Sequence, residues 1–411
     1  KGPILLKSNI GLKVDRSLKL QFEFDPASYR PGGKGVLSRY EGTTLYTHSP
    51  LIRGFNVENI SITDNGGDGP LPVIDGDGQK WREWEVQGNL ARGGQNDNSA
   101  SYIMAKEINA TGVPIPERRF DKEYLRPSIM QFFLSKRILV ENIKLVNSPF
   151  WTVHPLFSEN LTFRGLEFEA LVANNDGIDP ESSRYILIED VKFHNADDNV
   201  AIKAGRDKEG MEGVGVTGTE LEGIDSYYIR DGKIGGSTEY VVVRNCDFRG
   251  HYAICIGSEM SGGVNHIYVK DNQSDHRVNM GFYIKGGRNR GGVVSDIYVQ
   301  NMDLNEVKWE VVRLLPNYDR DTTSPNPSEF KNVYVENITA KYSGRGILIN
   351  GWADKKVRDV VLKDIRVDSL GQENPLVINH AEDVELINVN IAGHSLDSIY
   401  NVSNTAIPVP R

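Results

Sequence analysis

The chain has 411 residues, of which 39% are hydrophobic and 25% are charged, the composition of a globular protein able to bury a core. Its formal net charge of −9 argues against nucleic acid as the main partner. No run of 18 or more apolar residues occurs, so we expect no membrane span. The 41 glycines indicate many turns rather than long helices.

The first residues, Lys1-Gly-Pro-Ile-Leu-Leu, lack the continuous apolar region of a secretory signal and are typical of a strand. We therefore expect an N-terminal part that is truncated or processed. The two cysteines, Cys246 and Cys255, are expected to be buried thiols in core strands. No CxxC motif or His/Cys cluster is present, so we expect no metal and no cofactor.

One short pattern recurs along most of the chain: two alternating apolar residues, a two-residue step, and two more alternating apolar residues. The copies begin at Phe55, Ile138, Leu161, Ile186, Val241, Ile267, Ile297, Val333, Val360 and Val384. The copy at Ile267 is weaker, because Asn272 and Ser274 stand where apolar residues belong. Alternation with period two predicts a strand in each half, and the step predicts a bend between the halves.

Asparagine or aspartate usually occupies this bend, and both residues tolerate the left-handed backbone of a tight corner. The bend residues are Asn59, Asn142, Asp190, Asn245, Asn301, Asn337, Asp364 and Asn388. One copy cannot bury its own apolar face, so stacking the copies into a shared core is the physical solution. The sequence predicts an all-β protein: a single domain over residues 1–411, folded as a single-stranded right-handed parallel β-helix. Loops inserted at about 64–128, 206–239 and 305–329 are expected to cover one face or end.

Residues of equal phase in a parallel stack lie above one another at about 4.8 Å. Counted from the start of each copy, Asp176, Asp197, Asp198, His251 and Lys285 all fall on the strand or turn after the bend. Three carboxylates this close repel one another, so at least one should have a raised pKa. Glycoside hydrolysis needs that asymmetry, a protonated acid for the leaving oxygen and an ionised base for water.

Other polar and aromatic residues join this site by phase. They are Trp151, His154, Lys203, Glu259 and Arg313. A tryptophan can support a sugar face, although core packing is an equal alternative for Trp151. A polyanionic substrate would need a local basic patch in this acidic protein, and Lys203, Arg206, Lys285 and Arg288 would supply it.

Four motifs, in order, resemble those of glycoside hydrolase family 28, the polygalacturonases and related pectin hydrolases, in its bacterial type. They are Asn174-Asn175-Asp176-Gly177, Ala196-Asp197-Asp198-Asn199, Gly250-His251 and Ile284-Lys285. The resemblance implies that Asp197 is the general acid, that Asp176 and Asp198 hold and deprotonate water, and that His251 tunes the acid or positions sugar. It also implies that Lys285 binds a uronate carboxylate, and Asn174 and Glu259 join the expected substrate-binding residues.

One departure from the family pattern bears on the substrate. Tyr283 stands where the family usually carries an arginine, and a tyrosine cannot grip a carboxylate with a planar, charged fork. Tyr283 remains among the expected substrate-binding residues. Arg288 or Arg290 would restore the charge; alternatively, the neighbouring sugar is not a galacturonate.

The sequence therefore predicts an inverting hydrolase of α-linked galacturonic acid in pectic polysaccharide or oligosaccharide, with exo action favoured because inserted loops could close one end of the groove. A hydrolase of rhamnogalacturonan or another decorated pectin, a β-helix lyase, and a non-catalytic carbohydrate-binding solenoid stay open as alternatives. A polymeric substrate and the resemblance imply an extracytoplasmic location, periplasmic or secreted. Neither the oligomeric state nor the neighbouring sugar follows from the sequence.

Overall fold

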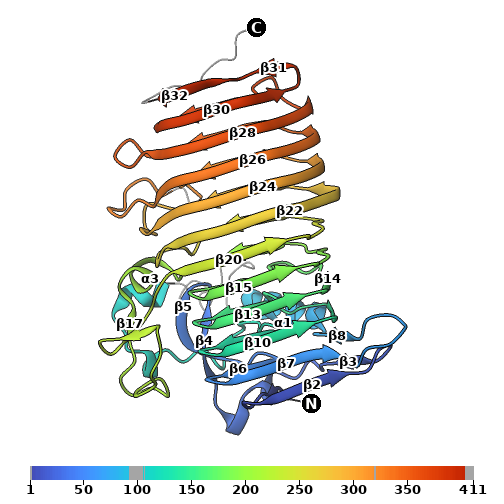
Figure 1. Ribbon diagram of the computed structural model, residues 1–411. Helices are drawn as coiled ribbons and strands as arrows, with labels where there is room; N and C mark the ends of the chain where they lie inside the picture. Colours follow the sequence, from blue (N-terminus) through green and yellow to red (C-terminus); the bar gives the residue numbers. More distant parts are fainter. Residues whose placement is uncertain (1, 92–104, 106, 319–320, 403–411) are drawn as a thin grey trace.

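The computed structural model describes residues 2–91, 105, 107–318 and 321–402. The chain winds into a right-handed parallel β-helix, an elongated stack of coils with the N-terminus at one end and the C-terminus at the other (Figure 1). Helices are few and lie outside the stack. The fold class expected from the repeats is confirmed.

The largest sheet contains one strand from every coil, and successive strands are parallel. Its strands are β2 (Ile10–Val14), β7 (Glu58–Asp64), β10 (Lys136–Glu141), β13 (Glu159–Arg164), β15 (Arg184–Glu189), β20 (Thr238–Arg244), β22 (Val264–Val278), β24 (Val293–Val307), β26 (Glu329–Ser343), β28 (Val357–Leu370) and β30 (Ala381–Ile391). Two short antiparallel strands, β31 (His394–Ser395) and β32 (Ser398–Val402), pair with β30 and cover its edge.

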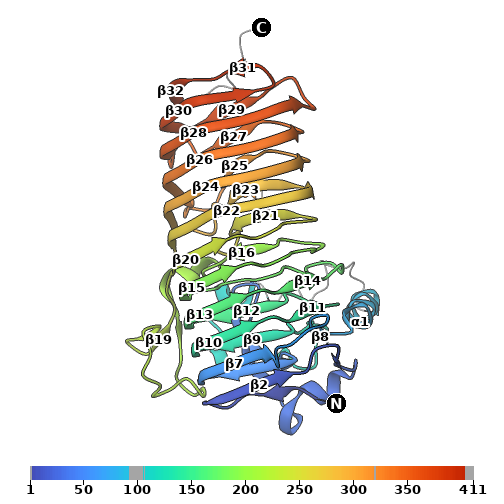
Figure 2. The same cartoon turned by 45° about the vertical axis from the view of Figure 1, so that its right-hand side comes forward.

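A second face of the helix carries the strands that matter for the site (Figure 2). In the N-terminal half these are β1 (Ile4–Leu5), β6 (Ile52–Phe55), β9 (Met130–Phe133) and β12 (Val153–Leu156). In the C-terminal half they are β16 (Val200–Ile202), β21 (Tyr252–Ile256), β23 (Met280–Lys285), β25 (Val312–Leu315), β27 (Ile347–Asn350) and β29 (Leu376–Asn379). Ile178 bridges to Val153 on one side and Val200 on the other, so the two halves form one continuous face.

A third, shorter sheet completes the N-terminal coils. It consists of β3 (Lys19–Gln21), β8 (Val73–Asp75), β11 (Lys144–Val146) and β14 (Glu167–Glu169). From β22 onward this face merges with the largest sheet, because β22, β24 and β26 continue through the bend as strands of 15 residues.

The predicted register is correct from Ile138 to the last coil. Ile138 pairs with Leu161 and Leu161 with Ile186, and the same alignment continues to Val360 and Val384. The first copy is the exception. Ile60, rather than Phe55, pairs with Ile138, so the phase predicted for this copy is wrong by five residues.

The residues predicted at the bends all have a positive φ, and all of them except Asn59 lie at the bend. Some also bond along the stack, as Asn337 Nδ2 does to Asn301 Oδ1 at 2.9 Å. A second column of left-handed residues lies just before each first apolar position and includes Arg137, Asn160 and Asp296. Asn59 belongs to this second column, because its neighbour Ile60 is the residue that pairs with Ile138.

The apolar residues of the repeats point inward and form one core along the helix axis. In the weak copy, Asn272 and Ser274 are buried but satisfied by backbone groups. Asn272 Oδ1 accepts from the Cys246 amide at 2.9 Å, and Ser274 Oγ donates to the Phe248 carbonyl at 2.7 Å. Cys246 and Cys255 are buried free thiols, as predicted.

The inserted segments are only partly loops. The region 64–128 contains the coil strand β8, α1 (Gly78–Ala91) and the short 3₁₀ turns at Ile108–Thr111 and Ile115–Glu117, while residues 92–104 and 106 lie outside the described part. The region 206–239 contains α3 (Asp207–Glu212) and a small sheet of β17 (Val214–Gly215), β18 (Ile229–Arg230) and β19 (Lys233–Ile234), and ends with the start of β20. The third prediction is too wide, because residues 305–315 include the end of β24 and all of β25.

The sequence pattern did not reveal a hairpin near the N-terminus. After 3₁₀ turns at Pro26–Tyr29 and Pro31–Gly33, β4 (Val36–Tyr40) and β5 (Thr43–Thr47) pair antiparallel outside the coils. None of the helices in the described ranges is long and apolar enough to cross a bilayer.

Candidate active site

The predicted carboxylates meet on adjacent coils at the start of the β16 strand. The Gly177 amide donates to the Asp198 carbonyl at 2.8 Å, which sets Asp176 beside Asp198. On the other side, Val200 pairs with Ile254, and this register sets His251 beside Asp197. The coil geometry therefore gathers in space four residues that the sequence spreads over 76 positions.

Asp198 lies at the centre of the cluster and is almost completely buried. Its Oδ2 is 2.6 Å from Lys285 Nζ and accepts the Cys255 thiol at 2.9 Å, while its Oδ1 is 3.1 Å from His251 Nδ1. Burial by itself would raise the pKa of Asp198, but the Lys285 and His251 charges outweigh burial and lower this pKa. Asp198 is the carboxylate that stays ionised.

Asp197 has the opposite electrostatic situation. Burial and the adjacent Asp198 charge raise the pKa of Asp197, and His251, 3.4 Å away, only partly offsets them. Its side chain is 29% exposed, against 2% for Asp198, so it can reach a ligand. Two neighbouring carboxyls with pKa values pushed apart are the arrangement that separates an acid from a base.

A buried lysine holds the third carboxylate together with one that the sequence reading missed. Lys203 Nζ lies 3.6 Å from both Asp176 Oδ2 and Asp179 Oδ1. Burial and the neighbouring Asp179 charge raise the pKa of Asp176, and burial raises the pKa of Asp179 to about 8. Asp179 was detectable in principle, because it lies on the same coil three residues after Asp176.

Lys203 also links the catalytic cluster to the side wall of the site. It lies 3.4 Å from Glu259 and 4.2 Å from the centre of the Trp151 ring. Glu259 in turn pairs with Arg206 at 2.7 Å. Burial opposes the ionisation of Glu259, but Lys203 and Arg206 lower its pKa, so this wall is an alternating row of charges.

These groups surround a cavity of about 350 Å³. Its lining residues are Glu41, Trp151, Asn174, Asp176, Asp197, Asp198, Lys203, Arg206, Ser258, Glu259, Lys285, Arg290 and Tyr318. Most of the lining is polar and combines carboxylates with lysine and arginine side chains.

The β4–β5 hairpin closes the cavity on its N-terminal side. The tip carbonyls of Glu41 and Gly42 accept from Arg206 Nε at 2.7 Å and the Arg206 amide at 3.1 Å. A β-carbon at Gly42 would lie 2.8 Å from the Arg206 backbone nitrogen, so the contact needs glycine at this position.

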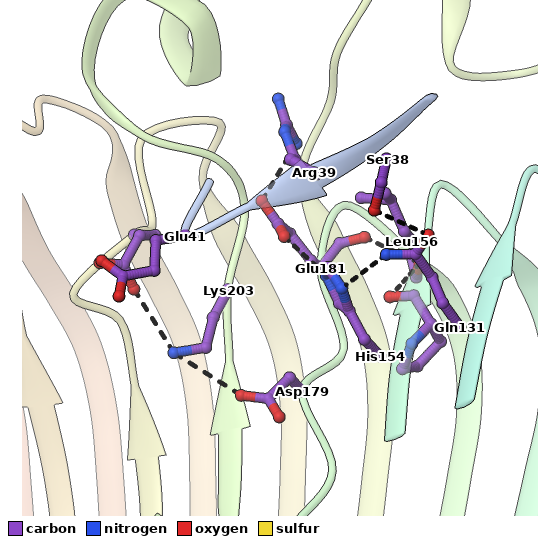
Figure 3. Close-up of polar contacts among 12 residues, drawn as sticks. Ser38, Arg39, Glu41, Gln131, His154, Leu156, Asp179, Glu181 and Lys203 are labelled. Carbon is purple, nitrogen blue, oxygen red and sulfur yellow. Dashed lines mark hydrogen bonds and ion pairs between the residues drawn. The ribbon is translucent and has the colours of Figure 1, made fainter. Parts of the chain in front are cut away.

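A buried ionic network anchors the hairpin to the coils (Figure 3). Arg39 on β4 pairs with Glu181 at 3.1 Å and with Glu209 of α3 at 3.2 Å. His154 donates or accepts at both ring nitrogens, 2.8 Å from Glu181 and 3.1 Å from Gln131. The side chains of this network are essentially inaccessible to solvent, so they hold the hairpin in place and do not contact a ligand. His154, a predicted binding residue, does not line the cavity.

The burial of residues along the strands of the second face, which carries the catalytic residues, shows where the groove is covered. All four residues of β9 and of β12 are buried, because the hairpin lies over them. On β25 and β27, buried and partly exposed residues alternate, as on a sheet face open to solvent. The groove is covered at β9 and β12, on the N-terminal side of the catalytic carboxylates, and open at β25 and β27, on their C-terminal side.

The structure does not bring two other predicted binding residues into the cavity. Tyr283 is buried among Ala201, Cys255 and Met280, with Arg313 5.4 Å from its ring centre. Arg288 points to Asp354, with both pairs of atoms 2.8 Å apart. Of the two arginines considered as replacements at Tyr283, only Arg290 lines the cavity.

Trp151 and Asn174 do line it. Trp151 also stacks on Phe150 in a small buried cluster, so its core packing is confirmed, and support of a sugar face stays a prediction. Asn174 is held by Arg126, whose Nη2 donates to its side-chain oxygen at 2.8 Å. Glu41 and Tyr318 were missed because they come from outside the repeated coils, where no phase can be counted.

Asp197, Asp198 and His251 offer ligand atoms within 4.8 Å of one another, a spacing that a metal could use. Lys285 lies 2.6 Å from Asp198, however, and supplies the positive charge that a metal would otherwise bring. The donor set is thus already neutralised by protein groups, and absence of a cofactor stays a prediction.

Comparisons with known proteins agree with this geometry. Residues 41–385 match the sequence profile described as glycosyl hydrolases family 28. A hyperthermoactive exopolygalacturonase from Thermotoga maritima has a similar structure, with a TM-score of 0.81 and 32% identity, covering 99% of this chain and 85% of that one. A family 28 exopolygalacturonase from Yersinia enterocolitica shares the fold, with a TM-score of 0.69 and 18% identity over 98% and 69% of the two chains.

Related sequences come from plants and bacteria. A probable polygalacturonase from Vitis vinifera is 29% identical over 286 residues, which are 69% of this chain and 45% of that protein. The chain thus spans less than half the length of this relative. An endo-polygalacturonase from Pectobacterium parmentieri is 24% identical over 381 residues, 90% of this chain and 77% of that one.

Proposed function

The chain belongs to glycosyl hydrolase family 28, and from this premise we propose that it is an inverting hydrolase that releases α-linked galacturonic acid from one end of a pectic chain. The observation that carries the chemistry is the pair Asp197 and Asp198, whose pKa values are pushed in opposite directions by burial and by Lys285. Such a pair supplies an acid and an ionised partner at one pH.

In this mechanism Asp197 gives its proton to the glycosidic oxygen as the bond to the anomeric carbon breaks. Asp198 and Asp176 hold a water molecule on the opposite face of the sugar. As this water attacks the anomeric carbon, the ionised Asp198 accepts its proton and the anomeric centre is inverted. His251, 3.1 Å from Asp198 and 3.4 Å from Asp197, adjusts the charge that each carboxyl feels. Lys203, Arg206, Lys285 and Arg290 make the cavity tolerant of a uronate.

Exo action is supported by the covered side of the groove. An enzyme that cuts inside a polymer must hold chain on both sides of the bond, whereas the hairpin fills the N-terminal side here. The similar Thermotoga maritima protein is named an exopolygalacturonase, and it covers nearly all of this chain. A polymeric pectic substrate places the enzyme outside the cytoplasm, in the periplasm or the medium.

The test is product analysis on oligogalacturonates of defined length. We expect release of galacturonate monomer, one unit at a time, with the β-anomer appearing first in the NMR spectrum and no effect of a chelator. Products of mixed length would contradict exo action, and the α-anomer first would contradict inversion. An unsaturated product absorbing in the ultraviolet would indicate a lyase, and activity on rhamnogalacturonan alone would indicate the decorated substrate.

A further inference from the structure

The cations of the catalytic cavity already have carboxylate partners. Lys203 contacts Asp176, Asp179 and Glu259, and Arg206 contacts Glu41 and Glu259. Lys285 pairs with Asp198 and Arg290 with Asp207. A uronate chain that leaves the cavity needs surplus positive charge elsewhere on the open side.

Such a surplus exists one strand beyond Tyr283. Arg313 Nε lies 2.9 Å from Glu310 Oε2, and Arg345 Nη1 lies 3.4 Å from Glu310 Oε1. Glu310 is fully buried, while the side chains of Arg313 and Arg345 are 16% and 35% exposed. Two guanidinium groups share one interior carboxylate, so the exposed part of the cluster is positively charged.

An aromatic ring accompanies these arginines. The Arg345 guanidinium lies 5.8 Å from the centre of the half-buried Trp309 ring, and Lys308 lies 5.1 Å from it on the exposed surface. A half-buried indole beside cations is a suitable contact for the apolar face of a sugar whose carboxylate is bound next to it.

The strand register places this cluster in line with the catalytic residues. Cys255, whose thiol contacts Asp198, pairs with Tyr283, and Tyr283 pairs with Arg313. Aligned residues of parallel strands point to the same face, and two strand spacings amount to roughly 10 Å. Arg313 thus lies on the site's own face, on the side that the hairpin leaves open.

We infer that Arg313, oriented by buried Glu310 and accompanied by Arg345 and Trp309, binds the carboxylate of a galacturonate residue on the leaving-group side of the cleaved bond. This inference rests on the proposed function, and it specifies how the enzyme recognises the part of the substrate that leaves when the bond is cleaved. This inference also accounts for Tyr283, which stands where the family usually carries an arginine. The Tyr283 ring lies under the Arg313 guanidinium, so a planar, charged group is present one coil further along, at the same register position.

The test compares two substrates with the variant Arg313→Gln. Tetragalacturonate offers carboxylates on the leaving-group side, and 4-nitrophenyl α-D-galacturonide offers a neutral leaving group. We expect kcat/KM on tetragalacturonate to fall by about 10- to 100-fold, the usual range for one charge-assisted, two-point contact, and kcat/KM on the nitrophenyl substrate to stay unchanged. Methyl-esterifying the leaving-group residues should cost the wild type a similar factor and the variant little more.

Removing Arg313 alone leaves the buried Glu310 carboxylate with only Arg345 as a cationic partner, which can destabilise the fold. The double variant Glu310→Gln/Arg313→Gln removes the buried negative charge together with Arg313, and so tests the loss of Arg313 without that destabilisation. The matched control is Arg366→Gln, an exposed arginine of β28 that pairs only with Asp368 in the described structure. Equal losses on both substrates, or no loss on either in a folded variant, would overturn the inference. If the wild type cleaves neither substrate, the proposed function itself fails.

Discussion

Asp179 offers a sharp test of the electrostatics of the site. This carboxyl is completely buried, its closest cation is Lys203 at 3.6 Å, and its neighbour is Asp176. Burial raises the pKa of Asp179 from 3.8 to about 8. We predict that Asp179 is neutral in the native enzyme below pH 7 and accepts a hydrogen bond from the Asp176 carboxyl.

The variant Asp179→Asn keeps the shape and an acceptor oxygen but cannot ionise. Between pH 4 and pH 8 the native wild type holds a proton on Asp179 that the unfolded chain has released, so stability falls as the pH rises. The slope is at most about 1.4 kcal/mol per pH unit, hence about 4 kcal/mol between pH 5 and pH 8 as an upper bound. The coupled Asp176 and the nearby Lys203 reduce this value.

The assay is urea unfolding followed by tryptophan fluorescence at pH 5 and pH 8. At pH 5 the variant should match the wild type within about 1 kcal/mol, as expected when one neutral hydrogen-bond acceptor replaces another. At pH 8 the variant should be the more stable protein, because all other titrating groups are shared. Identical pH dependence in the two proteins would refute the reasoning and mean that Asp179 is ionised in the native state.

Three further changes test the catalytic residues and the hairpin. Asp197→Asn should lower kcat by about 10²- to 10⁴-fold without lowering the melting temperature, since it removes a proton donor and little packing; near-normal turnover would reject its role as the acid. The carboxylate partner Asp198 outweighs burial and raises the pKa of His251, so His251 is charged below that pKa and loses its charge as the pH rises through it. His251→Gln should therefore flatten the alkaline limb of the kcat/KM profile, and an unchanged limb would assign it to another group. Gly42→Ala should cost about 1–2 kcal/mol for the positive φ, besides its clash with Arg206, and is expected to raise KM as the covering hairpin loosens; unchanged stability and KM would contradict the closing contact.

The sequence by itself determined the coils. Apolar alternation interrupted by Asn or Asp predicted both the strands and the left-handed corners, because stacking is the only way such units bury their apolar sides. Counting from those corners was enough to bring Asp176, Asp197, Asp198 and His251 together. It failed at Phe55, where asparagines at two successive corners make two phases of the pattern look alike.

Only the tertiary structure decided what surrounds the carboxylates. A hairpin that belongs to no repeat brings Glu41 to the cavity. The ion pair beneath it joins Arg39 and Glu181, which are more than a hundred positions apart in the sequence. Periodicity likewise cannot tell which outward residues other segments cover: His154 and Tyr283 have suitable phases yet are buried. The coil register is a local property that each repeat encodes, whereas access to the groove depends on how distant segments pack across it.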